Sequence, residues 1–202
     1  MKELTSYNRV AGYLNKVFDL LNAEFFENAL SRPTITIQST PRAYGHFSLR
    51  EDTWVSKLGG THEINIGAGT LARPIEEVTA TLLHEMVHYY NYENGIQDCS
   101  RGNTYHNRRF KAAAEAHGLI VEKGEKYGWH KTTLNPEALE FVQSLGKSGF
   151  SLVRPRITGL KGSSKKNTSR KYVCPCCGAI IRATKEVHVI CADCDCEFQE
   201  EI

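Results

Sequence analysis

Two histidines and a glutamate lie within five consecutive residues of the chain: His84, Glu85 and His88. On an α-helix, residues four positions apart lie above one another on the same face, so both imidazoles can reach one metal ion. Glu85 lies about 100° around the helix from His84, where its carboxylate can reach a water molecule beside that ion. The H-E-x-x-H spacing is typical of zinc hydrolases, in which the two histidines bind the metal and the glutamate is the general base. The pattern predicts a catalytic zinc site if a helix and a third ligand are also present.

The helix that must carry these residues is predicted over residues 73–94. Pro74 suits its first position, acidic residues in the next turn complement the helix dipole, and Asn94 and Gly95 end it. An apolar stripe runs beside the histidines, so we expect one side of the helix to be buried and the other to face a cleft. The stripe consists of Ile75, Val78, Leu82, Met86 and Tyr89.

A catalytic zinc ion needs three protein ligands and an open position for water. A second helix is predicted from about Thr104 to Ala116, capped by Asn103 or Thr104, and it would place His106 in its first turn. Glu115 is the rival ligand, because a later helix can also supply a carboxylate. The residues alone leave the third ligand open among Glu93, Asp98, His106, Glu115, His117 and His130, of which the last two are interpreted as capping or packing residues.

The remaining elements follow from periodicity and turn residues. Helices are predicted over 4–30 and 136–145, the second with Asn135 as its cap and Pro136 at its first position. Strands are predicted over 34–38 and 62–66, with weaker candidates at 44–49 and 54–58. A helix, a short sheet and then the metal helix indicate an α+β fold.

Six of the seven cysteines lie between residues 174 and 196. Four of them form a C-x2-C…C-x2-C pattern that predicts a closed, tetrahedral structural zinc site made by Cys174, Cys177, Cys191 and Cys194. A module of about 30 residues is too small to fold on core burial alone, so zinc would supply most of its stability. Because the N-terminus has no export signal, crowded cysteines indicate metal binding in a reducing compartment rather than disulfides. Cys176 and Cys196 keep the ligand choice open, and Cys99 is interpreted as a bystander.

The net charge of +2 is unevenly distributed. Residues 141–185 carry ten Lys and Arg and no acid, whereas residues 186–202 carry six acids and no Lys or Arg. A basic segment beside a metal module suggests a polyanion such as nucleic acid as partner, and a solubilising segment is the alternative. Residues 147–171 are predicted to be a basic, flexible linker. The candidate nucleic-acid contacts are Arg154, Arg156, Lys161, Lys165, Lys166, Arg170 and Lys171.

Residues 14–118 resemble the SprT-like zinc metallopeptidases, the family of the DNA–protein crosslink protease Spartan. The resemblance rests on residues 21–26, 64–66, 81–88, 106–110 and 117–118. It implies that His84, His88 and His106 bind zinc and that Glu85 is catalytic. Tyr105 and Asn107 flank His106, where the family often has small residues. Tyr89, Tyr90, Tyr92, Tyr105 and Tyr127 are all conceivable donors to the oxyanion, and the sequence does not choose among them.

The resemblance also implies an organisation and a function. We expect a zincin-like metallopeptidase core over 1–146, the linker over 147–171 and a zinc ribbon over 172–202, with one catalytic and one structural Zn²⁺. The expected activity is that of a zinc endopeptidase acting on DNA-associated or DNA-crosslinked proteins. The alternative is a catalytically idle adaptor that binds DNA through the linker and ribbon. No signal peptide or membrane span is expected. The protein is therefore predicted to be intracellular, cytoplasmic or nucleoid-associated in a bacterium or phage and nuclear in a eukaryote.

Overall fold

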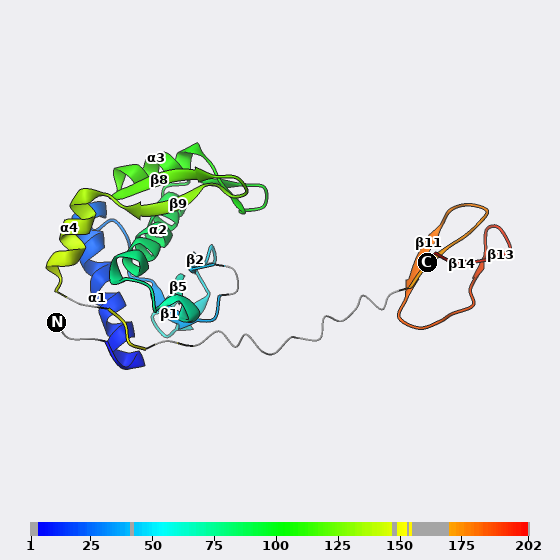
Figure 1. Cartoon of the computed structure of the whole chain (residues 1–202), viewed down its shortest axis with the longest axis horizontal. Coiled ribbons are helices and arrows are strands. Elements are labelled where there is room, and N and C mark those ends of the chain that lie inside the picture. Colours follow the sequence, from blue (N-terminus) through cyan, green and yellow to red (C-terminus); the bar gives the residue numbers. More distant parts are fainter. Residues whose placement is uncertain (1–3, 41–42, 147–148, 153, 155–169, 202) are drawn as a thin grey trace. The chain divides into compact units, whose positions relative to one another are not determined.

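The computed structural model describes residues 4–40, 43–146, 149–152, 154 and 170–201. The chain forms two compact units, Met1–Pro155 and Arg156–Ile202, which are drawn in Figure 1. The fold is α+β, as predicted, with four helices and several small sheets in the described residues. None of the helices found in these ranges is both long and apolar enough to cross a membrane.

The helix that carries the H-E-x-x-H motif, α2 (Ile75–Glu93), is the central element of the first unit. It contacts strands of the two larger sheets of this unit and also the other three helices (Figure 1). All five residues of the predicted apolar stripe are buried. Pro74 occupies the N-cap position rather than the first helical position, because its ψ of 145° is extended. Glu76 and Glu77 lie in the first turn and Asn94 is the C-cap, as predicted.

The first sheet has the strand order β1–β5–β2 and is covered by α1 (Tyr7–Phe26) and α2. β1 (Thr34–Gln38) runs parallel to β5 (Glu63–Gly67), with Ile35 opposite Ile64. β2 (Gly45–Phe47) pairs antiparallel with β5 and forms an edge of the sheet. A separate hairpin is formed by β3 (Trp54–Ser56) and β4 (Gly59–Thr61). The weaker strand candidates thus correspond to β2 and β3.

The second sheet has the order β6–β7–β9–β8 and was not predicted. Its strands are β6 (Cys99–Ser100), β7 (Tyr105–His106), β8 (Leu119–Gly124) and β9 (Gly128–Leu134). Leu119 and Val121 are buried and Ile120 between them is exposed, which is the alternation of a half-buried strand. The pairing of β8 with β9 shifts register between Glu122 and Gly124, and this irregularity weakens the pattern in the sequence.

The predicted helix from Thr104 is shorter than expected, because α3 spans Arg108–Ala116. Its cap is Asn107, whose side chain accepts hydrogen bonds from the backbone N–H groups of Arg109 and Phe110. Asn103 and Thr104 were therefore the wrong cap residues. His106 does not lie in the first helical turn but on β7, where it is held in register opposite Cys99 and Gly128.

The first unit continues past its predicted boundary at residue 146. α4 (Pro136–Ser144) has Asn135 as its cap and Pro136 at its first position, as predicted. Phe150 is nevertheless buried, with its ring edge-on to Tyr13 at 5.9 Å between centroids. This apolar side chain packs in the core, and the first compact unit accordingly extends to Pro155. Residues 147–148, 153 and 155–169 of the predicted linker lie outside the described residues.

The second unit contains a three-stranded sheet in the order β11–β10–β14 and the small β12–β13 pair. These strands are β10 (Arg170–Val173), β11 (Ile180–Ala183), β12 (Ile190–Cys191), β13 (Cys196–Glu197) and β14 (Gln199–Glu201). Arg170 and Lys171 therefore begin a strand of this unit, although both were assigned to the linker.

Candidate metal centres and catalytic cleft

Three imidazole rings meet at one point of the first unit. His84 and His88 lie one turn apart on α2, and His106 reaches them from β7. The Nε2 atom of His106 lies 3.2 Å from that of His84 and 3.1 Å from that of His88, and the two α2 atoms are 3.2 Å apart. Hydrogen bonds cannot join all three atoms, because each neutral ring carries a single N–H. The structure thus brings together the three histidines that the family resemblance implied as ligands.

Each of these rings has its second nitrogen held by another part of the first unit. An Nδ1–H that donates to an acceptor fixes the orientation of the ring and leaves Nε2 free as a ligand atom. The acceptors come from β9, from the loop after α2 and from the turn before β9. They are Thr132 Oγ1 at 3.0 Å from His84, Asp98 Oδ2 at 2.7 Å from His88 and the backbone oxygen of Tyr127 at 3.3 Å from His106.

The spacing and charge of the three rings fit a zinc ion. Zn–N bonds of about 2.0–2.1 Å in a tetrahedral site place two ligand nitrogens about 3.3 Å apart. Burial, followed by the neighbouring His88 and His106, lowers the pKa of His84 well below its usual value. Burial, followed by His88, also lowers the pKa of His106 to about 4. Both rings are therefore neutral at neutral pH, which is the form that binds a metal.

The histidines open onto a cleft of about 890 Å³ that Glu85 also lines. Burial raises the pKa of Glu85 to about 7, while His88 and a hydrogen bond from the backbone of Phe47 favour the ionised form. The close approach of β2 to α2 requires Gly45. A Cβ there would lie 2.8 Å from the carbonyl oxygen of Asn65 and 3.1 Å from Glu85 Oε1. A carboxylate that can accept a proton thus lies in the same cleft as the three histidines.

The other candidates for the third ligand have different partners. Within the described residues, His106 alone among the candidates is grouped with both His84 and His88. Glu115 in particular, the rival ligand, lies on α3 with its carboxylate 3.5 Å from Lys111 Nζ. The other partners are His62 for Glu93, His88 for Asp98, the Phe26 ring for His117 and the backbone oxygen of Gly128 for His130.

Aromatic residues form part of the cleft wall. Of the five tyrosines considered as oxyanion donors, Tyr92 and Tyr127 line the cleft. Tyr44, which the sequence did not indicate, also lines it, and the Arg73 guanidinium lies 4.0 Å from its ring centroid. His130 faces the cleft rather than serving only as a packing residue. His130 and Thr132 both lie on β9, so recognising the strand pattern over 119–134 would have indicated them.

Cys99, interpreted from the sequence as a bystander, lies beside the histidine site. Its Sγ, a ring nitrogen of His88 and a carboxylate oxygen of Asp98 all lie within 4.8 Å of one another. Burial, followed by the Asp98 carboxylate, raises the pKa of Cys99 to about 12, so the group is a protonated thiol. A single cysteine between two predicted helices carries no pattern from which this position could be predicted.

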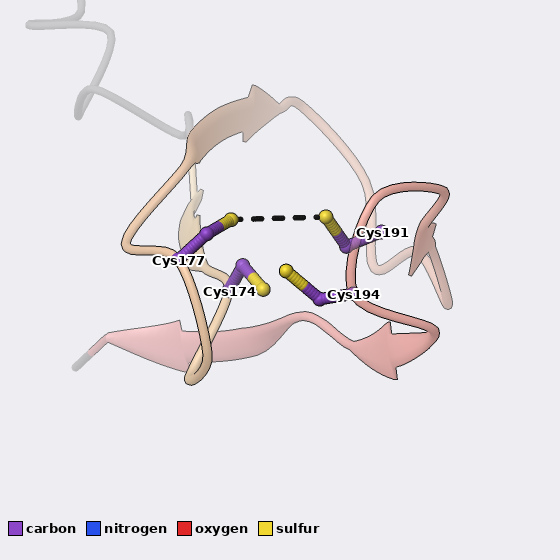
Figure 2. A group of neighbouring side chains, drawn as sticks. All are labelled: Cys174, Cys177, Cys191 and Cys194. Atoms are coloured by element: carbon purple, nitrogen blue, oxygen red, sulfur yellow. Dashed lines mark hydrogen bonds between the residues drawn. The ribbon is translucent and has the colours of Figure 1, made fainter.

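The second unit contains the other candidate metal centre. The sulfur atoms of its four cysteines lie within 4.8 Å of one another, and Figure 2 shows them pointing toward a common centre from two loops. The Sγ atoms of Cys177 and Cys191 are 3.8 Å apart. This distance agrees with the separation of about 3.8 Å between thiolates in a tetrahedral site with Zn–S bonds of about 2.3 Å. The group consists of the predicted residues Cys174, Cys177, Cys191 and Cys194.

Each loop of the four-cysteine site ends in a residue with left-handed backbone conformation. Gly178 has a φ of 74° after the first cysteine pair, and Asp195 has a φ of 52° after the second. The N–H of Gly178 donates to Cys174 O and that of Asp195 to Cys191 O, so both loops are tight turns. Cys176 and Cys196 form a disulfide with each other. The prediction that these cysteines bind metal and form no disulfide is therefore wrong for Cys176 and Cys196. Because both sulfur atoms are used in the disulfide, neither cysteine belongs to the four-cysteine group.

Of the seven basic residues proposed to contact nucleic acid, the structure describes Arg154, Arg170 and Lys171. Arg154 is exposed in the first unit, with its backbone N–H 3.4 Å from Ala68 O. Arg170 forms an ion pair with Glu200 at 3.0 Å, and Lys171 forms one with Glu201. These acids reduce the net positive charge that the two strand residues present. The other four, Arg156, Lys161, Lys165 and Lys166, lie outside the described residues.

Comparison with known proteins identifies a family. The model of the SprT-like family matches residues 14–126, which is more than half of the 202 residues. The matched range contains His84, Glu85, His88 and His106 but ends before Thr132 on β9. Searches of curated proteins and of solved structures found no significant match.

The contact between Thr132 and His84 predicts a loss of metal affinity when Thr132 is replaced by valine. Thr132→Val keeps the shape of the side chain but leaves His84 Nδ1–H without its acceptor. We expect zinc affinity at the histidine site to fall about 10- to 100-fold, the range for a lost contact that orients a ligand. Chelator competition measures this, and Thr133→Val, an exposed neighbour on the same strand, is the matched control. Equal affinities of the two variants would contradict the role assigned to Thr132.

Proposed function

We propose that this chain, which belongs to the SprT-like family, is a zinc-dependent endopeptidase in which Glu85 transfers the protons. The observation that carries the proposal is the convergence of three Nε2 atoms in the cleft that Glu85 lines. His84, His88 and His106 would hold the ion, which leaves one tetrahedral position for water. When bound, zinc supplies Lewis acidity toward that water and toward the peptide carbonyl.

Glu85 is placed to act as general base and then as general acid. Its carboxylate would take a proton from the attacking water and deliver it to the amine that leaves. The backbone of Phe47 holds the carboxylate on the β2 side of the cleft. Glu85 is buried and lines the cleft, so its carboxylate can reach a water molecule held there. These residues therefore supply the proton transfer of peptide hydrolysis.

The position of β2 supports an extended peptide as substrate. β2 pairs with β5 along one side and is the edge of its sheet, and its residues line the cleft beside Glu85. An edge strand presents unpaired backbone groups to which an extended chain can add by main-chain hydrogen bonds. Such binding depends little on side chains. The proposed activity is therefore cleavage of locally unfolded segments, with proteins bound or crosslinked to DNA as the proposed substrates.

We expect the second unit to be stabilised by a metal ion and, together with the basic segment before it, to bind nucleic acid. Four of its six cysteines, Cys174, Cys177, Cys191 and Cys194, would hold a structural zinc ion in a closed site. The ten Lys and Arg of residues 141–185, with no acid among them, support binding to the phosphates of nucleic acid. Contacts to phosphate fix position without reading sequence, so the partner would be bound by its backbone.

Replacement of Glu85 by glutamine tests the peptidase proposal. Glu85→Gln keeps the size of the side chain but removes the proton acceptor, so cleavage should fall by at least about 100-fold. The measurement is the rate of cleavage of casein and of a DNA-bound protein, with zinc content measured in parallel and expected to be unchanged. Glu77→Gln is the matched control, because Glu77 is an exposed acid in the first turn of the same helix.

Two outcomes would contradict the peptidase proposal. Cleavage by Glu85→Gln at the wild-type rate would remove Glu85 from the mechanism. Intact DNA binding by a zinc-loaded wild-type protein that cleaves neither substrate would favour the idle adaptor instead.

The salt dependence of DNA affinity tests the nucleic-acid proposal. If Lys161, Lys165 and Lys166 each contact a phosphate, their joint replacement by glutamine should reduce the slope of log K against log salt by about 2 to 3. Arg170→Gln/Lys171→Gln is the control. It should change the salt slope less, because Arg170 and Lys171 form ion pairs with Glu200 and Glu201. A flat salt dependence of the wild-type protein would contradict a phosphate-binding role.

A further inference from the structure

Two cysteines of the second unit are not needed for its candidate metal site. Cys176 lies between the two ligand candidates of the first loop, and Cys196 follows the second loop. Their disulfide joins positions 20 residues apart. Cys196 lies on β13 directly opposite Cys191 on β12, so the bridge also fixes the strand beside a ligand candidate. The disulfide therefore connects the same two loops that a bound metal would connect.

The second unit has little core of its own. Among the residues of this unit that the structure describes, only Tyr172, Cys174 and Cys191 are buried. So small a core cannot offset the conformational entropy lost by ordering more than 30 residues. Crosslinks between the loops must make up the difference. The structure offers two such crosslinks, the four-cysteine site and the Cys176–Cys196 bridge.

We propose that Cys176 and Cys196 form a reversible redox site, and that their disulfide and the metal of the four-cysteine site stabilise each other. The inference rests on the structural zinc of the proposed function and does not depend on peptidase activity. Each crosslink restricts the unfolded or metal-free chain and so reduces the entropy that the other must overcome. Because the coupling is an equilibrium property, it acts equally in both directions.

The redox step is a thiol–disulfide exchange with a small-molecule disulfide such as glutathione disulfide. One cysteine thiolate attacks the glutathione disulfide, and one glutathione thiolate leaves. The second cysteine thiolate then attacks the mixed disulfide, and the second glutathione leaves. The two protein thiols lose two electrons and two protons in total, and glutathione disulfide is reduced to two glutathione molecules. A zinc ion on the four ligand thiolates would direct the exchange to the two cysteines that it does not hold.

The size of the coupling follows from the closed loop. The disulfide joins residues 20 positions apart and so restricts the metal-free chain. Zinc affinity should therefore be on the order of 100-fold higher in the oxidised protein than in the reduced protein. By reciprocity, zinc should lower the reduction potential of the disulfide by about 60 mV. For a two-electron couple this shift corresponds to a roughly 100-fold change in the equilibrium constant.

The experiment uses the 202-residue chain with His84→Ala and His88→Ala, so that zinc titration reports the four-cysteine site. Zinc affinity is measured by chelator competition in reduced and in glutathione-oxidised protein, and peptide mass spectrometry identifies the linked cysteines. We expect a Cys176–Cys196 link and a ratio of affinities on the order of 100. Cys176→Ser/Cys196→Ser should bind zinc with the affinity of the reduced chain in both buffers. Cys99→Ser is the control that should keep the full ratio.

The outcomes separate this inference from the proposal on which it rests. Equal zinc affinity of the oxidised and reduced chains would overturn the coupling and leave the structural zinc in place. Oxidation that links ligand cysteines instead of Cys176 and Cys196 would overturn the redox site. If neither form binds zinc in this background, the structural zinc fails and the coupling fails with it.

Discussion

Two histidines one turn apart on a helix can form a catalytic zinc site only if a third protein ligand reaches the same side of that helix. In this protein the third imidazole comes from a strand, β7, which the second sheet holds against α2. The same sheet supplies Thr132, which orients the first of the two helical histidines. The position of α2 between the two larger sheets brings Nε2 atoms from two elements within 3.2 Å of one another. The cleft and the position of Glu85 follow from that arrangement.

The two units are stabilised in different ways. The first has a large buried core that includes Phe18, Phe110 and Met86, so its fold does not require the metal that its histidines fit. The second has few buried side chains among its described residues and depends on links between its two cysteine loops. Loss of metal should therefore affect the first unit mainly in chemistry and the second mainly in stability.

Local patterns explain which parts of the fold and site could be predicted. Signals within a single helix determine where α2 begins and ends, which of its residues are apolar and how its two histidines are spaced. All of these signals can be read from the sequence of that helix. The four-cysteine grouping likewise follows from short spacings. The placement of His106 on β7 depends on pairing with β9, more than 20 residues away, and a register shift in β8–β9 hides that hairpin. Phe150 and Cys99 acquire their positions through tertiary packing, for which the sequence contains no periodic signal.

X-ray absorption at the zinc edge tests the central claim, that three histidine nitrogens form one metal site, most directly. Replacing all six cysteines of the second unit by serine in the 202-residue chain leaves Cys99 as its single thiol, so zinc bound by the histidines can be observed without the four-cysteine site. The expected spectrum has three imidazole nitrogens at about 2.0–2.1 Å, one further light atom and no sulfur. A sulfur neighbour at about 2.3 Å would instead place Cys99 in the coordination sphere, and two imidazoles in place of three would remove His106 from it. Either result would contradict the site described for this protein.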